Sequence, residues 1–242
     1  MPKELVQDAH DTRVREDIAR MPKEAHSHPK PNSFGNEPHG HGQIKICVSG
    51  AAETGHCGLN SYELGKELGR EIVRQGAALT TGATTGMPLF AAVGAKEEGG
   101  LSIGFSPAAT EREHLETYKL PLDYMDVIVY TGFGFPGRDL LLTRSSDAVI
   151  LGCGRVGTIH EFTIAYEDRK PIGVLEGCWE TDEVLKHLIK ASNRPMDKVV
   201  FDTDPKRLVE KIIAMVKKDK EELNLVYNNH DGIGGTKGTL IL

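Results

Sequence analysis

The fold is decided by residues 147–169, which read DAVILGCGRVGTIHEFTIAYEDR. The run Ala148–Leu151 is short and wholly apolar, as is typical of a strand buried on both faces of a parallel sheet. A glycine-rich loop, Gly152–Gly157, follows it, and a helical pattern begins at Thr158. A strand, a glycine loop and a helix in this order predict an anion site, because glycines admit an oxyanion close to the backbone and a helix start offers free amide N–H groups. The alternative is a turn that needs glycine only for its backbone angles.

Six more short apolar runs predict strands on both sides of this one. They lie near Lys45–Ser49, Ala77–Thr81, Leu101–Phe105, Asp126–Tyr130, Ile172–Leu175 and Val199–Phe201. Helical periodicity separates them, for example where Leu64, Leu68 and Ile72 share one helix face. Asp204 before Pro205 opens the last long helix. This alternation predicts an α/β fold, a doubly wound parallel sheet of about seven strands with helices on both faces, whose ligand lies beyond the carboxyl ends of the strands.

The composition divides the chain into three segments. Residues 1–42 are rich in proline and histidine and predict a flexible leader, residues 43–225 form the α/β domain, and residues 226–242 form a glycine-rich tail. Some histidines of the leader invite a metal site: His26, His28, His39 and His41. A polar linker is the favoured interpretation, because zinc ligands are normally fixed by a fold. We therefore predict no metal and no cofactor.

The charge balance excludes some partners. With 29 Lys and Arg against 35 Asp and Glu, the formal charge is −6, so no overall positive field exists to hold a nucleic acid. No stretch approaches the roughly 18 apolar residues that a membrane span requires. The N-terminus has charges where a signal peptide needs an apolar run, and the cysteines lie far apart with no CxxC pair. These features predict a cytoplasmic protein with reduced cysteines, and a chain of this length needs no disulfide to fold.

Two further loops point to the same end of the sheet. Residues 49–55 (SGAAETG) follow the first predicted strand and residues 80–86 (TTGATTG) follow the second, and both lead into helices. Their hydroxyl groups can bind phosphate or ribose without adding charge. Three convergent loops predict one pocket for a nucleotide or another phosphorylated small molecule. Its candidate phosphate-binding residues are Gly50, Gly82, Thr84, Thr85, Gly86, Gly154, Arg155, Gly157 and Thr158.

Glu161 is the strongest candidate for a catalytic residue. It lies three residues beyond Thr158, at a helix start whose positive end would keep the carboxylate ionised. The alternative is a capping box, in which Glu161 bonds only the N-cap amide of Thr158. The pattern Thr110–Glu113 has the same spacing, so the sequence leaves capping and catalysis equally open.

Arg138 is the candidate cation. Arg138 and Arg144 lie on a predicted helix, Gly137–Ser146, that leads into the same strand. A guanidinium there can clamp a phosphate through two hydrogen bonds. An exposed basic residue is the alternative, and spacing alone favours it. His160 is predicted to lie at the surface or behind the site, and Cys153 to fill a turn.

A rival interpretation comes from Gly152-x-Gly154-x-x-Gly157, which matches the dinucleotide-binding fingerprint. Glu176, 19 residues after Gly157 at the end of the next strand, would then bind a ribose diol. Against NAD or NADP, this fingerprint normally occupies the first strand–helix unit of its fold, whereas at least three such units precede it here. No GxxxxGK[ST] sequence occurs, which disfavours ATP hydrolysis of the Walker type.

Four separated blocks give the chain a resemblance to a known family. Arg138, Ser146-Asp147-Ala148 and the run Cys153–Glu161 (CGRVGTIHE) keep the order and spacing of the signature of the LOG family, whose loop reads PGGxGTxxE. Residues Thr81–Met87 resemble the second glycine loop of that family. The LOG family, formerly called lysine decarboxylase-like, belongs to a Rossmann-like superfamily that includes molybdenum cofactor carrier proteins. The resemblance extends from about Gln43 to Leu223.

The resemblance implies cleavage of the N-glycosidic bond of a nucleoside 5′-monophosphate, which releases the base and ribose 5-phosphate. Glu161 and Arg138 occupy the catalytic positions, and the implied assembly is a homodimer or larger. Three residues differ from the LOG pattern: Cys153 replaces proline, Arg155 replaces the second glycine and Asp139 replaces the usual lysine. These differences motivate a second hypothesis, a non-catalytic carrier or sensor of a phosphorylated cofactor or nucleotide.

Overall fold

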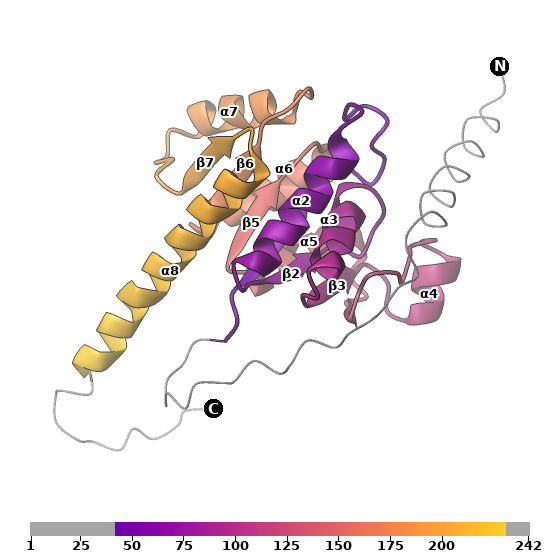
Figure 1. Cartoon of the computed structure of the whole chain (residues 1–242), viewed down its shortest axis with the longest axis horizontal. Coiled ribbons are helices and arrows are strands. Elements are labelled where there is room, and N and C mark those ends of the chain that lie inside the picture. Colours follow the sequence, from indigo (N-terminus) through magenta and orange to yellow (C-terminus); the bar gives the residue numbers. More distant parts are fainter. Residues whose placement is uncertain (1–41, 231–242) are drawn as a thin grey trace. The chain divides into compact units, whose positions relative to one another are not determined.

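Seven strands in one sheet carry the structure, a computed structural model that describes residues 42–230 (Figure 1). The strands are β1 (Lys45–Ser49), β2 (Ala78–Thr81), β3 (Ser102–Ser106), β4 (Val127–Tyr130), β5 (Ala148–Leu151), β6 (Ile172–Leu175) and β7 (Val199–Asp202). All neighbouring pairs are parallel, in the order β4-β3-β2-β1-β5-β6-β7. The predicted doubly wound sheet is thus confirmed, and β1, β5 and β6 have the predicted bounds.

The helices between and after the strands are α2 (Ser61–Arg74), α3 (Met87–Glu97), α4 (Glu111–Glu116), α5 (Gly134–Ser145), α6 (Val156–Glu167), α7 (Thr181–Ser192) and α8 (Pro205–His230). Asp204 caps α8 as predicted, because its Oδ1 accepts the Arg207 amide at 2.8 Å. Helix α8 continues past residue 225, so the predicted start of the tail falls within it. Residues 1–41 and 231–242, with the predicted leader and most of the tail, lie outside the described residues. Between residues 42 and 230, no helix is long and apolar enough to cross a membrane.

Side chains alternate along each strand between two apolar layers. Ile46 and Val48 of β1 join one buried cluster together with residues of α2, α3 and α8. Cys47 of β1 and Val149 of β5 join the other cluster together with residues of α5, α6 and α7. Helices therefore cover both faces of the sheet, as the sequence predicted. Burial on both faces explains why the strands are continuous apolar runs.

Helices α2 and α3 touch through their backbones, side by side on one face of the sheet (Figure 1). A Cβ atom at Gly69 of α2 would collide with the carbonyl of Ala91, and one at Gly94 of α3 would collide with the carbonyl of Lys66. Any larger residue at either position would push the helices apart. The two helices therefore pack as closely as their main chains allow.

Two of the cysteines are joined. Cys57 and Cys153 form a disulfide although 96 positions separate them, and both side chains are fully buried. The prediction of reduced cysteines is therefore wrong for this pair. Strands β1 and β5 are neighbours in the sheet, so the loops that follow them meet, a proximity that the spacing of cysteines in the sequence does not reveal. Cys47 and Cys178 are free thiols.

Candidate functional site

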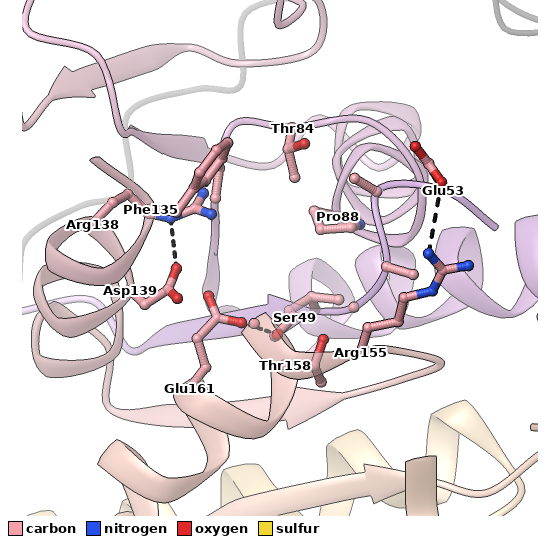
Figure 2. A pocket seen from close by; sticks show the side chains of 16 residues that line it. Ser49, Glu53, Thr84, Pro88, Phe135, Arg138, Asp139, Arg155, Thr158 and Glu161 are labelled. Atoms are coloured by element: carbon pink, nitrogen blue, oxygen red, sulfur yellow. Dashed lines mark hydrogen bonds and ion pairs between the residues drawn. The ribbon is translucent and has the colours of Figure 1, made fainter. Parts of the chain in front are cut away.

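A cavity of about 410 Å³ opens at the carboxyl ends of β1 and β5. These strands lie side by side where the strand order reverses, with β2 next to β1 and β6 next to β5. Ligand sites of doubly wound sheets form at this reversal, because the loops that follow the two strands diverge there. The cavity walls come from the loops after β1, β2 and β5, from α5 and from the start of α6 (Figure 2). Its volume is in the range of small-molecule sites.

Most of the predicted site residues lie on this cavity. They are Gly50, Gly82, Thr84, Arg138, Arg155, Gly157, Thr158 and Glu161. Ser49, whose hydroxyl group is one of those expected to bind phosphate or ribose, also lies on the wall. The structure adds wall residues that were not predicted as ligand contacts: Val48, Ala51, Ala52, Glu53, Pro88, Phe135 and Asp139. The structure thus brings together side chains from four separated segments of the chain.

Three predicted residues do not line the cavity but hold its loops in place. Thr85 Oγ1 donates to the carbonyl of Ala52 at 3.0 Å. Gly86 has a φ angle of +73°, and a Cβ there would collide with the loop after β1. The N–H of Gly154 donates to Thr181 Oγ1 at 2.8 Å. These residues support the shape of the cavity rather than form its surface.

The start of α6 presents the positive end of a helix dipole to the cavity. The helix begins at Val156, two residues before the predicted start, and the side chain of its N-cap residue Arg155 makes no capping hydrogen bond. The first-turn amides have no carbonyl acceptor within the helix. Gly157 and Thr158 line the cavity, and a Cβ at Gly157 would meet no atom within 4 Å. This wall can therefore receive an anion.

The observed helix start also decides between the two predicted roles of Glu161. Because Arg155, not Thr158, is the N-cap residue, the capping-box interpretation is wrong. The matching pattern elsewhere is a genuine cap, since Thr110 Oγ1 accepts the amide of Glu113 at 3.2 Å. The two patterns differ only in where their helices begin.

Glu161 points into the cavity and is only 6% exposed (Figure 2). Its Oε2 accepts a hydrogen bond from Ser49 Oγ at the end of β1. Burial raises the pKa of Glu161 to about 7 against the opposing charge of Arg138, and the carboxylate of Asp139 adds to the increase. A carboxyl group with this pKa exchanges its proton near neutral pH, as general acids and bases do.

Arg138 is buried, so the alternative interpretation, an exposed basic residue, is wrong for it. Its Nη1 donates to the carbonyls of Gly82, after β2, and of Phe105 in β3, the latter at 3.3 Å. A Cβ at position 82 would collide with this nitrogen, so the packing requires glycine there. Arg144, in contrast, is exposed and pairs with Asp168 at 2.9 Å.

Asp139 connects Arg138 to His160. Its Oδ1 accepts from Arg138 Nε at 2.9 Å, and its Oδ2 lies 3.0 Å from His160 Nδ1. His160 does not line the cavity and lies behind the site, as predicted. Asp139 itself was noticed in the sequence only as a departure from the LOG pattern. Its carboxylate partly neutralises the guanidinium of Arg138, the candidate cation.

Phe135 forms an apolar edge of the cavity that was not predicted. Its ring lies 5.6 Å from the Arg138 guanidinium and is 48% exposed. Phe135 precedes Arg138 by three residues on α5, and this helical spacing is the signal in the sequence that places both on one face. An exposed aromatic ring at a cavity edge can stack on a planar group of a ligand.

Arg155 stands at the mouth of the cavity. Its side chain is 63% exposed, with Nη1 3.8 Å from Glu53 Oε2 and Nη2 3.3 Å from His56 Nδ1. Exposed pairs of this kind contribute little stability, so the guanidinium can turn toward a bound anion.

Glu176, the predicted ribose ligand of the dinucleotide alternative, instead pairs with Lys186 at 2.8 Å and does not line the cavity.

Several known proteins are similar to this chain. The model of the SLOG cluster4 family matches residues 43–209. The molybdenum cofactor binding protein of the phototrophic bacterium Rippkaea orientalis is 27% identical, with a TM-score of 0.62 over 73% of this chain and 99% of that one. The molybdenum cofactor carrier protein of Chlamydomonas reinhardtii is 26% identical, with a TM-score of 0.56 over 71% and 99% of the two chains. An uncharacterised protein of Archaeoglobus fulgidus is 29% identical over 158 residues, which cover 62% of this chain and 99% of its own.

Proposed function

The chain belongs to the SLOG cluster4 family, and on that premise we propose that its cavity binds a phosphorylated small molecule, either a nucleotide or a phosphorylated cofactor. The observation that carries this proposal is the start of α6 on the cavity wall, where amide N–H groups and the helix dipole favour a phosphate. Ser49, Thr84 and Thr158 add hydroxyl groups on the same walls. The similarity to two molybdenum cofactor proteins supports the same class of ligand.

The test places a negative charge at this helix start. A Cβ at Gly157 has open space, so Gly157→Asp and the isosteric control Gly157→Asn both fit. An aspartate in the first turn stabilises a helix, so weaker binding would not come from unfolding. Two charges about 4 Å apart repel by about 1 kcal/mol in water and about 4 kcal/mol near a protein surface, or roughly fivefold to a thousandfold in affinity.

Isothermal titration calorimetry with AMP, GMP, ribose 5-phosphate and a molybdenum cofactor released from a molybdoenzyme measures this loss. We expect at least one of these ligands to bind the wild-type protein and the Asn variant with similar affinity. Binding to the Asp variant should be weaker by roughly fivefold to a thousandfold. Equal affinities of the Asp and Asn variants would place the phosphate elsewhere.

Within this class, the site favours a carrier that holds a phosphorylated pterin-type cofactor without cleaving it. Asp139 neutralises part of the charge of Arg138, and burial keeps Glu161 partly protonated at neutral pH. Hydrolysis of an N-glycosidic bond needs an ionised carboxylate beside the sugar, so the partial protonation of Glu161, to which Asp139 contributes, disfavours it. Native mass spectrometry of gently purified protein should therefore detect about one intact ligand per chain. Turnover of that ligand during incubation would exclude a carrier.

The second candidate function is the phosphoribohydrolase reaction of the LOG family. It is supported by Glu161 and Arg138, which line the same cavity as the helix start. With the phosphate at α6, the Glu161 carboxylate would stabilise positive charge on the ribose while water attacks. Release of free base from AMP or GMP should then rise as the pH passes about 7, where Glu161 ionises, and Glu161→Gln should abolish it. A wild-type protein that releases no base from any monophosphate would exclude this candidate.

The assembly that the resemblance implies, a homodimer, is also proposed. Strand β4 lies at the edge of the sheet, and its Val127 and Val129 are 49% and 39% exposed. An edge strand with exposed apolar side chains is prone to pair with another chain. Light scattering after size exclusion should give twice the chain mass of 26.4 kDa. Val127→Lys should shift the mass to that of one chain, and a monomeric wild-type protein would contradict the proposal.

A further inference from the structure

A cluster of one imidazole and two sulfurs lies next to Arg155, one of the residues that line the cavity. His56, Cys57 and Cys153 place one ligand atom each within 4.8 Å of one another. The two cysteines are fully buried, whereas His56 is exposed, so the cluster faces solvent on the histidine side. Cys57 Sγ lies 3.8 Å from His56 Nε2. We call these three residues the rim cluster.

We propose that the rim cluster binds one zinc-class cation when its disulfide is reduced. Thiolates and a neutral imidazole are the ligands that Zn²⁺ takes in proteins, at about 2.3 Å and about 2.0 Å. Two sulfurs on one tetrahedral ion stand about 3.7 Å apart, a separation that follows from the zinc–sulfur distance. The Cα atoms of Cys57 and Cys153 are 5.5 Å apart, which lets rotation of the side chains reach that separation. A water molecule completes the four ligands.

The charge and the burial of the rim cluster also favour a divalent cation such as Zn²⁺. Thiolates that are buried without a partner are costly, so the reduced cysteines alone would stay protonated as neutral thiols. Two thiolates and one divalent ion form a neutral complex, which removes that cost. His56 supplies a further ligand without adding charge and gives the ion a path from solvent.

A dithiol can serve as the reductant of the Cys57–Cys153 disulfide. The dithiol transfers two electrons and two protons to the Cys57–Cys153 disulfide, which becomes two thiols, and the dithiol becomes a disulfide. Zn²⁺ then displaces the two thiol protons into solvent. Oxidation reverses both steps and releases the ion.

Occupancy of the rim cluster should also end the contact between Arg155 and His56. Guanidinium N–H groups can only donate, so the 3.3 Å contact makes His56 Nδ1 the acceptor and leaves the ring proton on Nε2. A cation on Nε2 moves this proton to Nδ1, which ends the contact with Arg155. Arg155 lines the cavity and then keeps only its exposed pair with Glu53 at 3.8 Å, so one fewer contact holds its guanidinium away from an anion there.

The test is a titration of the full chain with Co²⁺, a coloured substitute for Zn²⁺. The protein is reduced with a phosphine, stripped of metal and kept free of oxygen. Thiolate-bound Co²⁺ gives a charge-transfer band that imidazole sites do not give, so the leader histidines His26, His28, His39 and His41 cannot produce it. We expect the band to saturate at one equivalent, to disappear on addition of Zn²⁺, and to be absent from the oxidised protein. A reduced wild-type protein without this band overturns the proposal.

Variants identify the ligands. Cys57→Ser and Cys153→Ser should abolish the band, and His56→Ala should weaken Co²⁺ binding at least about tenfold, since loss of a residue behind a ligand already costs that much. Cys178→Ser is the matched control, because Cys178 is a free cysteine close to the cluster. Its Cβ lies 3.8 Å from the place that a Cβ at Gly58, the residue after Cys57, would occupy. A band that survives Cys153→Ser, or that disappears with Cys178→Ser, overturns the assignment. The wild-type titration does not depend on the folding of any variant.

Discussion

Reduction of the Cys57–Cys153 disulfide should remove a large part of the stability of the protein. The two cysteines are separated by 96 positions, and a crosslink that closes a loop of about this length restricts the unfolded chain by about 4.7 kcal/mol. Whole domains are stable by only about 5–15 kcal/mol. In a domain of roughly this size, 1 kcal/mol moves the melting temperature by about 2–4 °C. The reduced protein should therefore melt roughly 9–19 °C below the oxidised protein.

Thermal unfolding followed by circular dichroism measures this difference, with a phosphine as the reductant. A chelator must be present, so that no metal replaces the crosslink. A double variant, Cys57→Ser with Cys153→Ser, should melt like the reduced wild-type protein and should not respond to the phosphine. The double variant Cys47→Ser with Cys178→Ser keeps the disulfide and should still respond. Equal melting temperatures of oxidised and reduced wild-type protein would refute the reasoning.

Other predictions concern the cavity. Gly82→Ala should displace Arg138 and lower the free energy of unfolding in urea by about 1–3 kcal/mol, while Gly157→Ala, where a Cβ has open space, should change it by less than about 1 kcal/mol. Glu161 has a folded pKa of about 7 against an ordinary value of 4.5, so the folded state holds its proton more tightly, and the stability of the wild-type protein relative to Glu161→Gln should fall by about 3 kcal/mol as the pH rises from about 4 to about 8. Urea unfolding of both proteins at the two pH values measures this difference, and an equal change in both proteins would contradict the raised pKa. Phe135→Ala should weaken binding of a ligand with a planar ring by about 1–3 kcal/mol in calorimetry, with Phe135→Tyr as the control that keeps the ring.

The sheet was predictable from local pattern alone. Buried parallel strands are short apolar runs, and Ala148–Leu151 or Ile172–Leu175 show such a run with a polar residue, glycine or proline at each end. The position of the cavity was predictable for the same reason, because the glycine loops end strands whose carboxyl ends meet at one edge. The strands and the position of the cavity depend on residues that are close together in the sequence, so the periodicity of apolar residues predicts them.

The orientation of the site residues was not predictable in this way. Thr158 and Glu161 repeat the pattern of Thr110 and Glu113, yet only the latter pair caps a helix, because α6 already begins at Val156. The burial of Arg138 likewise depends on a glycine 56 positions away that leaves room for its guanidinium.

The disulfide depends on topology. The predicted doubly wound sheet already implies that the first strand neighbours one from the second half of the chain. The register that brings Cys57 and Cys153 together comes only from packing in three dimensions. Spacing in the sequence therefore suggested free thiols where the fold forms a crosslink.

The backbone contact of α2 with α3 limits how the cavity can widen. With the main chains already touching at Gly69 and Gly94, neither helix can slide past the other, so the loops that lead into them are tethered to a common rigid block. Transient widening that admits a ligand should then come from the walls that α5 and the start of α6 form. Deuterium uptake should accordingly be slowest in α2 and α3 and faster in α5, and the rate at which a ligand leaves should follow the motion of α5.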